Sequence, residues 1–115
     1  MLNSAESAAD RATVHSGLMA SDARVPVDRA TIERSWKERG FSCGIWVDPP
    51  GQVWADYVHE TDELVMVVDG DVEFEIDGKA HRPSPGDELL IPARARHTVR
   101  NLGRGESRWL YGYRR

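Results

Sequence analysis

The sequence predicts an all-β domain, a barrel or sandwich, that follows one short helix. Turn signals such as Asp69-Gly70 and Asp77-Gly78 recur from residue 41 onward. Between them lie short apolar or alternating runs, of which Val72–Ile76 is the clearest. Turn-bounded runs spaced about 8–12 residues apart are typical of antiparallel all-β folds.

Length and composition favour one globular domain. The chain has 115 residues, of which 40% are hydrophobic and 30% charged, as expected for a single core. The net charge is −4. The densest basic run, residues 94–104, is offset by acidic residues elsewhere, so we interpret it as solvated loop charge, with a site for an anionic substrate as the alternative, and expect no nucleic-acid partner.

We expect a cytoplasmic protein that has no membrane partner. Cys43 is the only cysteine, so no disulfide forms within the chain, which fits a reducing compartment. The first twenty residues carry Glu6, Asp10 and Arg11 and have no apolar core of a secretory signal. No apolar run approaches the ~20 residues of a membrane span.

Two parts are expected along the chain: a flexible arm over residues 1–25 and one barrel domain over residues 26–115. The domain opens with a helix at about 28–39, capped by Asp28, with Ile32 and Trp36 on one face. The barrel then covers about 41–113. Its expected strands are 41–47, 52–59, 63–68, 72–76, 79–82, 88–91, 97–101 and 108–113.

The alternation in the second strand predicts which residues face inward. Val53, Ala55, Tyr57 and His59 share one face, which we interpret as the inside, and Trp54 takes the other. The predicted interior is apolar and narrow, which favours a small organic ligand. Its expected members are Val53, Val65, Val67, Phe74, Leu89, Ile91 and Trp109.

Three residues from separate strands form a candidate metal site. His59 ends one strand, Glu63 opens the next and His97 opens a later one, and a closed barrel would bring them together. Two imidazoles and a carboxylate suit Fe, Mn, Ni or Zn. Spacing alone leaves alternatives open: a rim histidine at His59, a surface carboxylate at Glu63 and a solvent-facing loop histidine at His97.

Two spaced motifs resemble those of the cupin superfamily. The first keeps every spacing of the cupin pattern, as does the second. The first motif aligns Gly51, Tyr57, His59, Glu63 and Gly70; the second aligns Gly86, Pro92, Arg94, His97 and Asn101. The resemblance covers about residues 41–113 and implies a cupin-type double-stranded β-helix, the jelly-roll barrel.

The resemblance implies one divalent metal on His59, Glu63 and His97. Tyr57 stands where the family's first histidine is expected, and Arg94 replaces a loop glycine. Tyr57 has three possible roles: a fourth metal ligand, a hydrogen-bond partner of a water on the metal, or a packed aromatic. Among inward groups, Tyr57 and Glu63 are the candidates for proton transfer, although a ligated Glu63 would be a poor base.

Similar cupins include dioxygenases, isomerases and decarboxylases, among which a fold cannot choose. We therefore expect a metal-dependent enzyme, dioxygenase-like or isomerase-like, acting on a small organic molecule. The alternatives are a non-catalytic ligand-binding module and a metal-free assembly piece. The family also implies a homodimer. Trp36, Trp46 and Trp54, placed outside the predicted interior, favour an interface, unless the helix covers that sheet within one subunit.

Overall fold

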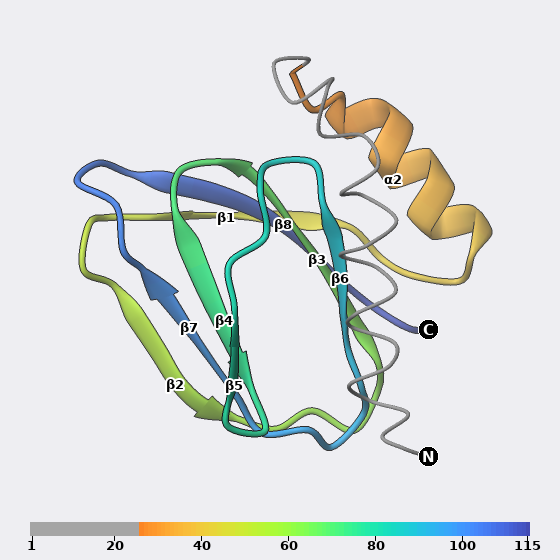
Figure 1. Cartoon of the computed structure of the whole chain (residues 1–115). Coiled ribbons are helices and arrows are strands. Elements are labelled where there is room, and N and C mark those ends of the chain that lie inside the picture. The colour runs from red at the N-terminus through yellow and green to blue at the C-terminus, as the bar shows by residue number, and fades with distance from the viewer. Residues whose placement is uncertain (1–25) are drawn as a thin grey trace.

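Two antiparallel four-stranded sheets form the protein, as the computed structural model of residues 26–115 shows (Figure 1). The predicted arm, residues 1–25, lies outside the described residues. One sheet has the order β1-β8-β3-β6 and the other β2-β7-β4-β5. The strands are β1 (Gly44–Asp48), β2 (Val53–Tyr57), β3 (Glu63–Asp69), β4 (Val72–Ile76), β5 (Lys79–His81), β6 (Glu88–Ile91), β7 (His97–Asn101) and β8 (Ser107–Tyr113). The predicted all-β jelly-roll barrel is confirmed.

The apolar core lies between the two sheets. Six of the seven predicted inward residues belong to it; Val53 does not. Phe74 on β4 packs edge-on against Trp109 on β8, with 5.5 Å between ring centroids, and so joins one sheet to the other. The buried members of the core are Val65, Val67, Val72, Phe74, Ile76, Leu89, Ile91, Ala95, Val99 and Trp109.

The predicted helix forms as α2 (Arg29–Glu38), with Asp28 accepting hydrogen bonds from the first-turn amides. It covers the outer face of the first sheet, where fully buried Trp36 packs in a second apolar cluster with Leu64 and Leu110. A side chain at Gly112 would collide with the Ser42 carbonyl and the Trp36 ring. Trp36 is therefore buried within its own chain, and its burial does not call for a second subunit.

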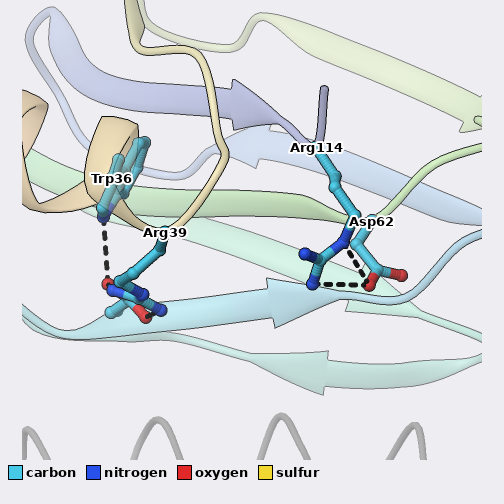
Figure 2. A network of polar contacts seen from close by, with 5 residues as sticks. Trp36, Arg39, Asp62 and Arg114 are labelled. Atoms are coloured by element: carbon cyan, nitrogen blue, oxygen red, sulfur yellow. Dashed lines mark hydrogen bonds and ion pairs between the residues drawn. The ribbon is translucent and has the colours of Figure 1, made fainter.

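Two groups of polar contacts lie on this side of the molecule, one at the end of the helix and one near the C-terminus (Figure 2). The Trp36 indole donates to Glu88 Oε1 at 3.0 Å, and the Arg39 guanidinium donates to both Glu88 oxygens at 2.9 and 2.7 Å. Near the C-terminus, Arg114 donates to Asp62 Oδ2 at 3.3 and 3.4 Å. The helix is thus fixed to β6 and is not a free appendage.

The prediction for the faces of β2 is wrong in its first half. Val53 is 46% exposed, whereas Trp54 packs against the inner core. The pairing of β2 with β7 shifts between Trp54 and Tyr57, and Asp56 takes a left-handed φ of 60°. This bulge inserts a residue and reverses the alternation. Tyr57 therefore faces the interior together with Trp54 and not with Val53.

Within residues 26–115, no helix combines the length and apolar character that crossing a bilayer requires.

Candidate metal centre

Both sheets contribute to the centre. Glu63, the first residue of β3, lies opposite Tyr113 on β8, and His97, the first residue of β7, lies opposite Tyr57 on β2. Directly opposed residues of antiparallel strands project to the same face. His59 lies in the connection that carries the chain from β2 to β3. The three predicted ligands therefore converge at the end of the barrel where these strands begin or end.

The carboxylate of Glu63 lies between the two imidazoles. Its Oε1 is 3.7 Å from His59 Nε2 and 3.5 Å from His97 Nε2, and the three ligand atoms lie within 4.8 Å of one another. Glu63 is only 3% exposed, and its Oε1 has no hydrogen-bond partner. Leaving such an oxygen buried and unpaired is costly. A cation held by all three groups would satisfy it, so these donors fit a divalent metal.

The His97 ring is oriented for ligation. Its Nδ1 lies 3.1 Å from the Ala95 carbonyl, which only accepts, so Nδ1 donates and Nε2 is left with its lone pair toward Glu63. Burial lowers the pKa of His97 and also that of His59. Both rings are therefore neutral at pH 7, the form that binds metals. The alternative of a solvent-facing His97 is wrong, since its side chain is 4% exposed.

Burial raises the pKa of Glu63 to about 8. Without a cation, the acid is therefore mainly protonated at neutral pH, because the surroundings provide no positive charge to stabilise the carboxylate. Binding a metal would release that proton. The alternative of Glu63 as a surface carboxylate is wrong.

A cavity of about 190 Å³ opens beside the ligands. It is predominantly aromatic rather than aliphatic. Trp46 and Trp54 line it, so their predicted position outside the interior is wrong. Its walls are Trp46, Trp54, Tyr57, Glu63, His97, Val99, Trp109 and Tyr113.

Two of these tryptophans are held by Asp48, a residue that the sequence analysis missed. The Asp48 carboxylate is 3% exposed and accepts from Trp54 Nε1 at 3.1 Å and from Trp109 Nε1 at 2.9 Å. Asp48 has the same parity as Trp46, which the sequence analysis placed outside the interior, so no local signal indicated its role. The contact fixes the cavity wall on the β1 side.

The comparisons agree with this architecture. A family model described as the cupin domain matches residues 44–113. The chain is a cupin. It is 33% identical over 73 residues to "Polyketide synthase CurC" of Streptomyces cyaneus, covering 63% of this chain and 47% of that protein. It is 36% identical over 73 residues to "Protein SchB" of Streptomyces halstedii, covering 63% and 52%. This cupin thus spans about half the length of the curated relatives it matches.

Solved cupin structures extend the likeness. A cupin 2 domain-containing protein from Halorhodospira halophila superposes with a TM-score of 0.61 at 26% identity, covering 65% of this chain and 52% of that one. The family and the fold predicted from the two motifs are thereby confirmed.

In this cupin, two tyrosines flank the ligands where the family's first histidine is missing. Tyr57 is 42% exposed, and its ring stacks against His59 with 6.1 Å between centroids. The Tyr113 hydroxyl lies 3.4 Å from His59 Nε2. Burial, and next the nearby charge of Glu63, raise the pKa of Tyr113 to about 12. The sequence analysis missed Tyr113, although its parity with the inward Trp109 indicated the same face.

Proposed function

We propose that this cupin is a metal-dependent enzyme whose single divalent ion is held by His59, Glu63 and His97. The observation that carries the proposal is the buried, unpartnered Glu63 Oε1 between two imidazole nitrogens. Fe, Mn, Ni and Zn all suit this donor set. When bound, such an ion supplies Lewis-acid polarisation of a substrate oxygen.

The substrate we propose is a small, planar carbonyl or enol compound. Trp46, Trp54 and Trp109 offer flat apolar walls, and the cavity of about 190 Å³ is too small for a bulky ligand. One relative is named as a polyketide synthase, and polyketide chains are rich in enolisable carbonyls. That likeness supports a polyketide-type intermediate as the substrate class.

The protein's own groups would divide the work. The tryptophan walls orient the plane of the substrate and exclude water. Tyr57, half exposed at the cavity, is placed to donate its hydroxyl proton to a substrate oxygen. Glu63 as a metal ligand would be a poor base. Dioxygenase-like and isomerase-like reactions are separated by comparing turnover in air with turnover under anaerobic conditions.

Metal content is the direct test. Protein purified without chelator is expected to contain one divalent ion per chain, and His97→Ala is expected to lose it. His81→Ala, a histidine on β5, is the matched control and should retain it. Full metal stoichiometry in His97→Ala would refute the ligand assignment.

A non-catalytic ligand-binding module is the second candidate. The missing first histidine, replaced by Tyr57, and the aromatic cavity both suit a protein that captures a molecule without transforming it. The measurement that separates the two is product formation by the metal-loaded protein from enolisable aromatic ketones. Binding without turnover would favour the module.

We also propose a homodimer, which the edge strands support. β1 and β2 are the first strands of their sheets, and Val47 on β1 and Val53 on β2 are 48% and 46% exposed. Exposed apolar edges of this kind favour association. A light-scattering mass equal to one chain would refute it. The cytoplasmic location stays a prediction.

A further inference from the structure

We propose that Tyr113, and not Tyr57, supplies a fourth protein ligand to the metal centre through its phenol oxygen, whose O–H bond breaks and releases the proton to solvent as the oxygen–metal bond forms. This inference rests on the proposed function, since it concerns the same ion. It addresses the position that the sequence leaves open, because the first motif has a tyrosine where a histidine is expected.

Position favours Tyr113. It lies directly across from Glu63 in the β3–β8 pairing, so the acid and the phenol project from one face of one sheet. Its ring meets the His59 ring edge-on, with 4.9 Å between centroids. The Tyr113 hydroxyl lies 3.4 Å from His59 Nε2, so the phenol oxygen is next to the nitrogen that would hold the ion. Tyr57 instead stacks nearly parallel to His59, at an interplanar angle of 20°.

The distances around the centre form a consistent set. His59 Nε2 lies 3.4 Å from the Tyr113 hydroxyl and 3.7 Å from Glu63 Oε1, and Glu63 Oε1 lies 3.5 Å from His97 Nε2. Strong hydrogen bonds to a carboxylate or imidazole are shorter, at about 2.7–2.9 Å. Neighbouring ligands of an ion with bonds of about 2.0–2.1 Å lie roughly 2.9–3.4 Å apart, whether the ion takes six ligands or four, and a five- or six-coordinate ion keeps a position open for the substrate. The set is thus closer to metal-ligand spacing than to hydrogen bonding.

Burial separates the two tyrosines as well. Tyr57 is 42% exposed, whereas Tyr113 is half-buried beside the 3%-exposed Glu63. A ligand exchanges less readily with water when its surroundings exclude solvent. Tyr57 is therefore left free to contact the substrate at the opening, while Tyr113 completes the donor set.

The test uses copper(II), which binds nitrogen and oxygen sites tightly and absorbs in the visible region when a phenolate coordinates it. The full chain is stripped with chelator and loaded with one equivalent of copper(II). The variants are Tyr113→Phe, Tyr57→Phe and Tyr111→Phe, each checked for folding by circular dichroism. Tyr111 is the matched control, since it lies on the same strand with its ring packed over Gly44.

We expect a phenolate-to-copper band in the unaltered protein, in Tyr57→Phe and in Tyr111→Phe, and its loss in Tyr113→Phe. Zinc affinity, measured by competition with a chelator, should fall about 10-fold in Tyr113→Phe alone. A band that persists in Tyr113→Phe, or that disappears in Tyr57→Phe instead, overturns the inference. So does a protein that binds one copper ion without any such band, although the proposed function then stands. Failure to bind any metal overturns both.

Discussion

The neighbouring strands β7 and β2 position the two histidines of the centre differently: His97 on β7 is held rigidly, and His59 after β2 is held less rigidly. β7 is a regular inner strand, its His97 side chain is 4% exposed, and Ala95 fixes the ring. β2 is an edge strand with a bulge, and the His59 that follows it is 30% exposed. The difference suggests that one imidazole is preorganised and the other adjusts when the ion or substrate binds.

Replacing each histidine by alanine is the strongest test of that inequality. Even outer partners of metal ligands contribute about 10–100-fold to affinity, so His97→Ala is expected to weaken zinc binding by more than about 100-fold. His59→Ala should cost less, roughly 10–100-fold, because water can reach the vacated position at the exposed side. Isothermal titration with zinc gives both values. Equal losses would show that the two imidazoles are held alike.

Glu63 faces both imidazoles, and its titration gives the next largest effect. The groups around it that titrate are His59, His97 and Tyr113. In the metal-free protein, the folded pKa of Glu63 is about 8, above the ordinary value of 4.5. The folded state thus holds the proton more tightly, and this contribution to stability is lost as the pH rises toward 8.

The two imidazoles act in the opposite direction below pH 6.5, because their folded pKa values are lowered. From pH 6.5 to 8 the acid dominates, although the unfolded imidazoles lose their remaining protons over the lower half of this window and oppose it. Across the window, the unfolding free energy of chelator-treated protein should fall by about 1–2 kcal/mol, and Glu63→Gln should abolish that fall. Urea denaturation at several pH values measures it. An unchanged slope in Glu63→Gln would contradict the buried neutral acid.

The bulge in β2 depends on one side-chain contact from β7. Thr98 Oγ1 accepts the Asp56 amide at 3.0 Å, in place of a strand-to-strand backbone bond. Thr98→Val keeps the shape but leaves that amide unpaired, and is expected to destabilise the fold by about 1 kcal/mol. Thr98→Ser, which retains the hydroxyl, is the control. Thermal melts that do not distinguish valine from serine would indicate that the bulge holds without this bond.

The sequence predicted which candidate ligands come together better than it predicted their surroundings. The cluster of His59, Glu63 and His97 follows from the spacing of the two motifs, which does not depend on the faces of the intervening strands. Val53 was placed on the wrong face because the strict two-residue alternation was extended back from Tyr57 across the bulge, where the extra residue reverses it. No sequence signal around Asp56 indicates its left-handed backbone conformation, which reverses the alternation of faces along β2.

Asp48 and Tyr113 were missed for a different reason, because their partners are distant in the sequence. Asp48 reads as an ordinary turn residue until the fold brings Trp54 and Trp109 to its carboxylate. Tyr113 lies 54 positions from His59, and only the pairing of β8 with β3 joins them. Local patterns specify elements and faces, whereas contacts of this separation follow from topology.

The smallest expected effect concerns the contact between the loop before β7 and the segment that follows β2. The Arg94 amide donates to the His59 carbonyl at 2.6 Å, so the loop before β7 supports the segment that carries the less rigid imidazole. Arg94 adopts a left-handed φ of 66°, which explains why the family pattern has glycine at this position.

A non-glycine residue is destabilised by about 1–2 kcal/mol in this conformation, and the greater entropy of glycine in the unfolded chain offsets roughly 0.5–1 kcal/mol of that gain on replacement. Arg94→Gly is therefore expected to stabilise the protein by up to about 1 kcal/mol, with zinc affinity unchanged. Arg96→Gly, two positions along the same loop, is the control and should not stabilise it. A destabilised Arg94→Gly would mean that its exposed side chain, 3.5 Å from Glu60, contributes more than the backbone strain costs.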